Sequence, residues 1–218
     1  MGRRNEVGVR ITERDLAIVQ WLSRVRFATA EQVARQFALS ERVAYRRLRA
    51  GVAEELVWHK QPLVGVPGVY GATNTGAQVA KSPLSGSRWD WRHHDHTLAV
   101  VDLMIAIGQH YPEAAVQTER ELAAALYAQG LPRGERSHLP DGVLRLGDRV
   151  VALEVELTAK SATRLQAIFR QYARQREYTD VWYYAAPPVF PRLTQAAHDL
   201  SFVRVFPFPL TPDAFMVL

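Results

Sequence analysis

Three carboxylates have types and spacing that suit metal binding. Asp141 follows Pro140 at the start of an expected strand, and Glu154 and Glu156 lie two residues apart within the mostly apolar segment 150–157. Side chains two apart on a strand point to the same face of a sheet. Burying unpaired carboxylates is costly unless a cation or hydrogen bonds compensate. A divalent cation would compensate here and would also activate water.

A second chemical feature is a group of arginines in one expected helix, which begins after Ser40, runs from Glu41 to about Ala50 and ends near Gly51. Its apolar residues face inward by helical spacing, which leaves the opposite face to basic and aromatic side chains. The residues available for that face are Arg42, Tyr45, Arg46 and Arg49, with Arg47 at its margin. These arginines are suited to binding DNA. Alternatively, they form a solvated face or salt bridges with acidic neighbours, namely Glu41, Glu54 and Glu55.

The distribution of charge favours the first half of the chain as the part that binds an anionic partner. The net charge is +5 over 218 residues. Residues 1–88 hold 14 basic and 7 acidic residues, a balance of +7, whereas residues 89–218 hold 13 and 15, a balance of −2. Arginine outnumbers lysine by 24 to 3. Its planar fork suits phosphate and guanine, although an arginine-rich genome gives the same bias.

The elements around these arginines form a tight helix–turn–helix followed by a hairpin. Helices are expected from Thr12 to about Arg24 and from Thr29, which has Gln32 in capping-box position. Strand-like segments 56–60 and 68–72 flank a Pro/Gly turn. This order over residues 10–82 resembles the winged-helix family.

The winged-helix resemblance implies that the helix of residues 41–50 enters the major groove of double-stranded DNA. Its N-terminal Arg42 then contacts base edges. Arg46 and Arg49 hold phosphates, Tyr45 does either, and Lys60 contacts the backbone from the hairpin. Winged helices also mediate protein contacts, so a protein-interaction module is an alternative.

The composition of residues 82–87 indicates a linker, which predicts a winged-helix domain over 1–82, a linker over 83–92 and a second domain over 93–218. The second domain reads as α/β with one mixed sheet. Helices are expected at 97–110, 119–128, 161–176 and 192–200, and strands at 115–118, 141–146, 150–157, 180–185 and 202–206.

Pro140-Asp141 followed by Glu154-Val155-Glu156 resembles the restriction-endonuclease-like superfamily. The resemblance implies a magnesium-dependent DNA endonuclease or nickase, in which Glu119, Asp141 and Glu154 bind the metal. The superfamily's lysine position holds Glu156 here, and Lys160 lies four residues further on. Catalysis would therefore use Asp141 and Glu154, with Glu156 or Lys160 handling the proton of the attacking water.

A closer resemblance covers nearly the whole chain. It rests on the winged helix, the His-rich stretch His93–Leu98, Glu119–Leu122, Pro140–Gly142 and Glu154–Ser161. These features resemble the replication-relaxation family of plasmids and other mobile elements. The resemblance implies a DNA-binding protein that acts in replication, DNA relaxation, mobilisation or transcriptional control.

Composition narrows the remaining possibilities. The chain has no cysteine, so disulfides and zinc–thiolate sites are excluded and a metal site would favour Mg²⁺ or Mn²⁺. The sequence has no long apolar run and no signal-peptide pattern, which predicts a cytoplasmic protein, associated with the nucleoid or a plasmid, that has no membrane partner. It has no glycine-rich phosphate loop, which predicts that it binds no nucleotide cofactor. A homodimer is also expected, because a single winged helix seldom gives enough specificity.

Overall fold

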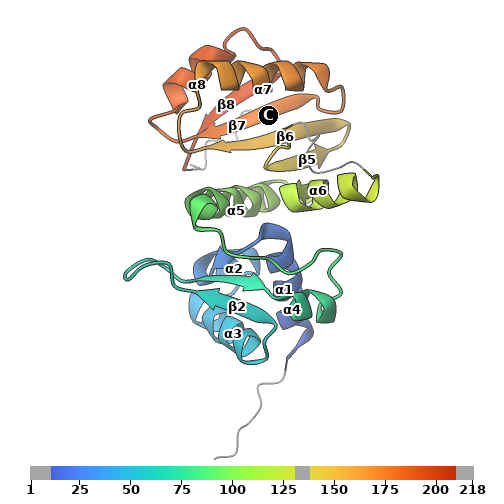
Figure 1. The fold of residues 1–218 in the computed structure, drawn as a ribbon, viewed down its shortest axis with the longest axis vertical. Helices are drawn as coiled ribbons and strands as arrows, with labels where there is room; N and C mark the ends of the chain where they lie inside the picture. The colour runs from blue at the N-terminus through green and yellow to red at the C-terminus, as the bar shows by residue number, and fades with distance from the viewer. Residues whose placement is uncertain (1–10, 131–137, 210–218) are drawn as a thin grey trace, which may run out of the picture. The chain divides into compact units, whose positions relative to one another are not determined.

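The computed structural model describes residues 11–130 and 138–209 (Figure 1). The chain divides into two compact units, Met1–Arg92 and His93–Leu218, with a short 3-10 helix, η1 (Trp91–His93), at the division. Part of the expected linker is bound to the first unit. The Ser87 backbone N–H donates to the Ala72 carbonyl, and its carbonyl accepts from the Trp58 indole at 2.9 Å. None of the described helices has the length and apolar character needed to cross a bilayer.

The helices of the first unit begin where their capping residues predict. In α1 and α2 the capping side chain accepts from the backbone three residues on, and the side chain there returns a bond to the cap. This reciprocal arrangement satisfies N–H groups that the first helical turn leaves unpaired. The helices, each with its capping residue, are α1 (Glu13–Val25, Thr12), α2 (Ala30–Gln36, Thr29), α3 (Glu41–Ala53, Ser40) and α4 (Asn74–Val79, Thr73).

The helix α3 is longer than the sequence predicts. Gly51 is expected to end it, but the helix continues to Ala53. Gly51 is buried, and a methyl group added there would lie 2.9 Å from Cγ2 of Val57. The glycine therefore permits close packing of α3 against the following strand rather than ending the helix.

The strands of the first unit form one small antiparallel sheet in the order β1-β3-β2. They are β1 (Ala28–Thr29), β2 (Val57–Lys60) and β3 (Val69–Ala72). The sheet, the three helices α1 to α3 and the hairpin loop of residues 61–68 together make a winged helix, and we call this loop the wing. The core of the first unit contains the fully buried side chains of Leu22, Phe27 and Leu48.

The second unit is an α/β domain in which helices alternate with strands, except that β6 follows β5 directly. Their order is α5 (His94–His110), β4 (Ala115–Thr118), α6 (Glu119–Ala128), β5 (Gly142–Leu146), β6 (Arg149–Glu156), α7 (Ala162–Arg174), β7 (Asp180–Ala185), α8 (Phe190–Ala197) and β8 (Val203–Pro207). The five strands form one mixed sheet in the order β4-β5-β6-β7-β8. The pairs β4–β5 and β5–β6 are antiparallel, and β6–β7 and β7–β8 are parallel.

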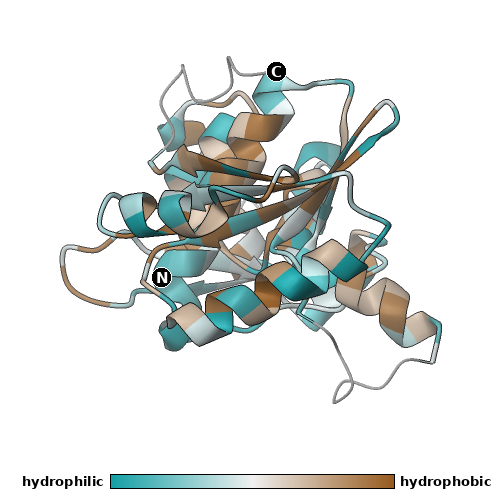
Figure 2. Ribbon diagram, turned by 90° about the horizontal axis from the view of Figure 1, so that it is seen from above, coloured by the Kyte–Doolittle hydropathy of each residue, from teal (hydrophilic) through white to brown (hydrophobic). Residues whose placement is uncertain are grey.

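Helices cover both faces of this sheet. Leu153 and Val155 of β6 belong to the core shared with α5, whereas Ala152 belongs to the core shared with α7 and α8. The strands are accordingly hydrophobic over most of their length (Figure 2). Because side chains alternate along β6, Glu154 and Glu156 point to the α7 face. A carboxylate pair therefore lies within an otherwise apolar layer.

Candidate functional site

The outer face of α3 is a free cationic surface. Arg42, Arg46 and Arg49 are exposed, and Tyr45 is 48% exposed. Across residues 11–130 and 138–209, none of these three arginines has a hydrogen-bond or ion-pair partner. The alternative of ion pairs with Glu41, Glu54 and Glu55 is therefore not realised in the described part of the chain. We call Arg42, Tyr45, Arg46 and Arg49 the arginine face.

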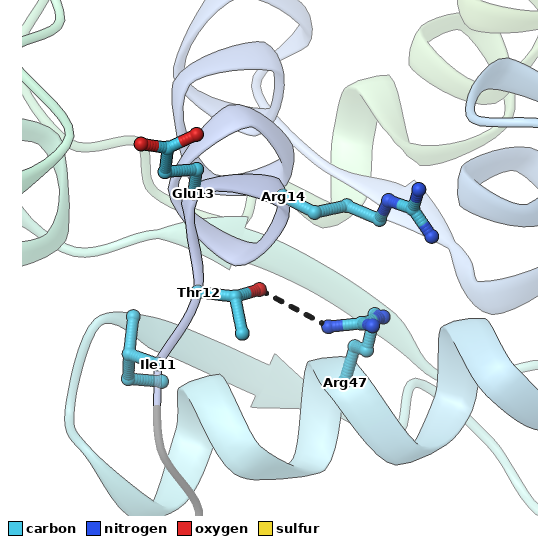
Figure 3. A pocket seen from close by; sticks show the side chains of 5 residues that line it. All are labelled: Ile11, Thr12, Glu13, Arg14 and Arg47. Atoms are coloured by element: carbon cyan, nitrogen blue, oxygen red, sulfur yellow. Dashed lines mark hydrogen bonds between the residues drawn. The ribbon is translucent and has the colours of Figure 1, made fainter.

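Arg47 does not belong to the arginine face. Its guanidinium donates to Asp15 Oδ1 at 2.9 Å. It also donates to the Thr12 hydroxyl at 3.3 Å (Figure 3). Burial would raise the pKa of Asp15, but the hydrogen bonds from Thr12 and the charge of Arg47 outweigh burial and lower it. Arg47 thus holds α3 against the start of α1, which is a structural role that its predicted place at the margin of the helix does not reveal.

The hairpin lies near the arginine face. Lys60 is exposed at the end of β2, next to the wing. The neighbouring His59 ring stacks on Tyr70 of β3, with ring centroids 4.6 Å apart. Burial raises the pKa of Tyr70. Tyr45 raises it further and Arg49 lowers it, so both side chains lie within electrostatic range of Tyr70. The arginine face and the base of the hairpin therefore lie near each other, on either side of the buried Tyr70.

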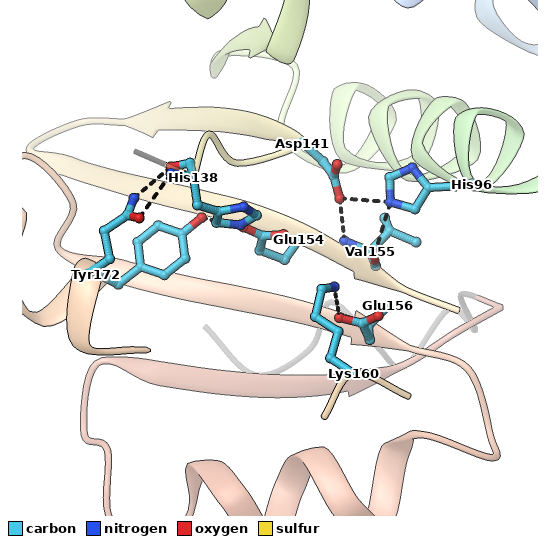
Figure 4. Close-up of polar contacts among 9 residues, drawn as sticks. His96, His138, Asp141, Glu154, Val155, Glu156, Lys160 and Tyr172 are labelled. Carbon is cyan, nitrogen blue, oxygen red and sulfur yellow. Dashed lines mark hydrogen bonds and ion pairs between the residues drawn. The ribbon is translucent and has the colours of Figure 1, made fainter. Parts of the chain in front are cut away.

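Asp141 and His96 meet at the end of β6 (Figure 4). The pairing of β5 with β6 ends at Gly142 and Leu153, which leaves the Val155 backbone without a strand partner on that side. The Val155 N–H donates to Asp141 Oδ2 at 2.8 Å, and His96 Nε2 lies 3.2 Å from the Val155 carbonyl. His96 Nε2 also lies 3.3 Å from Asp141 Oδ2. The two side chains therefore replace the missing strand.

Glu154 is the most buried carboxylate of the cluster, at 3% exposure. Its Oε1 accepts from the Tyr172 hydroxyl of α7 and lies 2.5 Å from His138 Nε2. Burial and the nearby charge of Asp141 raise the pKa of Glu154, and His138 opposes them only in part. Burial alone would lower the pKa of His138, but the hydrogen bond and charge of Glu154 raise it. The pair therefore retains a proton more firmly than either group would in water.

Glu156 and Lys160 form the third part of the cluster. Glu156 is 5% exposed, and the Lys160 ammonium four residues further on donates to its Oε2. Lys160 also lies close enough to affect the charges of His96 and His138. The ammonium therefore pairs with Glu156 and lies within electrostatic range of the histidines that contact Asp141 and Glu154.

One buried hydroxyl next to the carboxylates has no hydrogen-bond partner in the part of the chain that the structure describes. Tyr183 pairs with Glu154 across β6 and β7 and is 1% exposed. Its hydroxyl makes no hydrogen bond within the described residues, and burial together with Glu154, Glu156 and Asp141 raises its pKa. A buried phenol without a partner is costly, so this position favours a further polar group.

The structure places Glu119 at the start of α6, where its backbone N–H donates to the Asp141 carbonyl at 3.1 Å. Within the described ranges, however, no three His, Asp or Glu side chains are arranged as a metal site. The carboxylates are instead divided among separate partners. The set of Glu119, Asp141 and Glu154 thus remains a prediction about a metal-bound form.

Sequence reasoning missed His96, His138, Tyr172 and Tyr183 as members of this cluster. The first lies in a His-rich stretch, which is a weak signal for it. The partners of His96 lie 45 and 59 residues away, and no spacing rule connects them. Tyr172 and Tyr183 fit the apolar pattern of their elements, which conceals their polar atoms.

The histidines predict how the stability of the second unit depends on pH. Burial would lower the pKa of His96, but Asp141 and the Val155 carbonyl raise it. A histidine whose pKa is raised by folding stabilises the folded state fully below about pH 6.5, the pKa of a free histidine. This stabilisation is lost as pH rises through the higher pKa of the folded state. The raised pKa of Glu154 likewise makes stability fall as pH rises. The melting temperature of this unit is therefore expected to fall as pH rises above about 6.5.

Scanning calorimetry checks this pH dependence. His96→Gln retains a donor toward Asp141 but does not titrate, so it should flatten the profile. His198→Gln is the matched control, because that side chain is 82% exposed and its ring pairs with the exposed Asp199. A second unit that becomes more stable with rising pH would contradict the assignment.

Comparison with known proteins identifies one family. A family model described as replication-relaxation matches residues 19–191 of the chain. No curated protein sequence matches the chain.

Among solved structures, Lactococcus lactis ZitR is 14% identical with a TM-score of 0.30, over 62% of this chain and 82% of that one. A ZitR variant in complex with DNA is 16% identical with a TM-score of 0.31, over 61% and 81%. The adhesin competence repressor of Streptococcus pyogenes is 16% identical with a TM-score of 0.31, over 56% and 83%. Scores this low do not establish a common fold.

Proposed function

Because the chain belongs to the replication-relaxation family, we propose that it is a DNA-binding protein of a plasmid or another mobile element. It would act in replication, relaxation, mobilisation or transcriptional control, in association with the plasmid or nucleoid. The observation that carries the proposal is the arginine face, whose three guanidinium groups have no partner among the described residues. Unpaired arginines on a helix–turn–helix are suited to phosphates and guanine edges.

Each residue of the surface has a distinct proposed contact. The second helix of the motif inserts its N-terminal part into the major groove, which assigns base edges to Arg42 in the first turn of α3. Arg46, Arg49 and Lys60 hold phosphates, and Tyr45 serves either purpose. Arg47 is left out of this set because it binds Asp15. Phosphate contacts position the protein, and base contacts select the sequence.

A gel-shift titration of the full chain on duplex DNA over a series of salt concentrations tests this function. Binding should weaken linearly in log salt, with a slope of about −0.9 per phosphate contacted. Failure to bind any duplex at low salt would overturn the proposal in favour of a protein-interaction module. Sedimentation of the complex also tests the proposed homodimer, which predicts two chains on two half-sites one helical turn apart.

A second candidate function is a metal-dependent DNA endonuclease or nickase with a restriction-endonuclease-like fold. The observation that favours it is the gathering of Asp141, Glu154, Glu156 and Lys160 at adjoining ends of β5 and β6. The residues suit Mg²⁺ or Mn²⁺, which take oxygen ligands and need only one or two carboxylates. The unpartnered Tyr183 hydroxyl gives the cluster a donor for one further polar group.

Asp141 and Glu154 would hold the cation, with Glu119 as the third ligand that the resemblance implies. A divalent cation at such a site neutralises phosphate charge and activates water. Tyr172 and His138 orient the Glu154 carboxylate, and His96 orients that of Asp141. Glu156 or Lys160 would handle the protons of the reaction: the Glu156 carboxylate would accept the proton of the attacking water, and the Lys160 ammonium, which donates to Glu156, would give one to the leaving oxygen.

Incubation of supercoiled plasmid with the protein and Mg²⁺ or Mn²⁺ tests the nuclease. The wild type should produce nicked circles, which a chelator prevents. Asp141→Asn should abolish nicking, since it removes the charge but retains an oxygen for the Val155 N–H. Asp148→Asn, in the exposed β5–β6 turn, is the matched control. Absence of nicking by the wild type, or equal nicking by Asp141→Asn, would eliminate this candidate.

A further inference from the structure

The wing presents apolar rather than charged side chains. Residues 61–68 include no Lys, Arg, Asp or Glu. At its tip, Leu63 is 69% exposed and Val64 is 102% exposed. Single exposed aliphatic residues are common, but two adjacent ones at the tip of a projecting hairpin form a small apolar point. Figure 1 shows this loop extending away from β2 and β3.

The tip is held in a defined shape. The Val66 N–H donates to the Leu63 carbonyl at 3.3 Å, and Gly65 at the third position of this turn has φ +82°, as a type II turn requires. The Gln61 amide donates to the Leu63 carbonyl at 3.0 Å and also to that of Val66. Prolines at 62 and 67 restrict the backbone on both sides. A braced loop loses little conformational entropy when it binds.

The position of the tip relates it to the arginine face. The wing extends from Lys60, and an extended chain of four residues spans about 13 Å, enough to cross from the major groove past one phosphate backbone. At the base of the hairpin, His59 stacks on Tyr70, and Tyr70 lies within electrostatic range of Tyr45 and Arg49 of the arginine face. With α3 in the major groove, this reach is long enough for the tip to meet the neighbouring minor groove.

We infer that Leu63 and Val64 act as an apolar wedge, which enters the minor groove and bends the DNA at the base step it contacts. This inference rests on the proposed DNA-binding function. The tip carries no cation for a phosphate, and aliphatic wedges partly unstack a base step and kink the duplex. Pyrimidine–purine steps deform most easily, so the wing would select TA or CA steps without hydrogen-bonding to a base.

The test compares the wild type with Leu63→Ser/Val64→Ser on duplexes labelled for fluorescence energy transfer between their ends. The wild type should shorten the end-to-end distance, and the double variant should lose most of that bend. Affinity should fall about tenfold while the salt slope stays unchanged, because no phosphate contact is removed. Val79→Ser is the matched control, since Val79 is a 49% exposed valine of α4 outside the hairpin.

The outcomes separate this inference from the function on which it rests. Duplex binding without bending, or equal bending by the double variant, overturns the wedge and leaves the arginine face intact. Failure of the wild type to bind any duplex overturns both. A double variant that binds with a reduced salt slope would also overturn the wedge, because that result marks phosphate contact.

Discussion

Replacement of Arg42 and Arg46 together with alanine is expected to weaken duplex binding about 100-fold and to flatten its salt dependence by about 1 to 2 units of slope. Both guanidinium groups are exposed and unpaired among the described residues, so their removal leaves no buried charge behind. The loss should therefore appear in binding and not in folding. Gel shifts over a salt series, with thermal unfolding of the same samples, measure both quantities.

The control for this double variant is Arg192→Ala, which removes an exposed arginine from α8 of the second unit. It should leave affinity and slope nearly unchanged. Single variants divide the roles further. Arg42→Ala should relax sequence preference, whereas Arg46→Ala should weaken all duplexes alike. Unchanged affinity in the double variant would mean that α3 is not the recognition helix.

His138→Ala is expected to destabilise the second unit by about 3 kcal/mol at neutral pH. It would leave the Glu154 carboxylate, 3% exposed, without the cationic partner that lies 2.5 Å away. Because domains are stable by only about 5–15 kcal/mol, this loss is a large part of the total. The cost should shrink as pH falls, because the raised pKa of Glu154 makes its carboxyl neutral at a higher pH than that of an ordinary glutamate.

Urea unfolding of a double-mutant cycle measures this coupling. Adding Glu154→Gln to His138→Ala should recover part of the lost stability, since the uncompensated charge is removed. His198→Ala is the matched control, because its imidazole is largely exposed and should cost nothing measurable. Equal costs for His138→Ala and His198→Ala would contradict the buried pair.

Local signals predicted most of the first unit. The capping residues Thr12, Thr29 and Ser40 act within three or four residues, so their helices begin where the sequence indicates. The two-residue strand β1 was missed, because it exists only through pairing with β3 some forty residues later. The helix α5 begins at His94 rather than the predicted Thr97, since the His-rich stretch joins the helix instead of preceding it.

The candidate sites were predictable where periodicity decides and not where distant partners do. Alternation along a strand placed Glu154 and Glu156 on one face. The same helical spacing left Arg47 at a margin, and only Asp15, on another helix, fixes its role. Likewise, Glu154 is paired by His138 and Tyr172, which come from two other segments. Long-range pairings of this kind have no local sequence signature.

The contact of Asp141 with the Val155 backbone has an evolutionary consequence. Selection for folding alone suffices to retain an acidic or amide residue at 141, since it completes the edge of β6. Among relatives, retention of Asp141 would then accompany retention of His96 whether or not DNA is cut. The side chains of Glu156 and Lys160 bind each other and, among the described contacts, no backbone group. Relatives that differ at positions 156 and 160 but retain His96 and Asp141 would share the fold without the proposed nuclease activity.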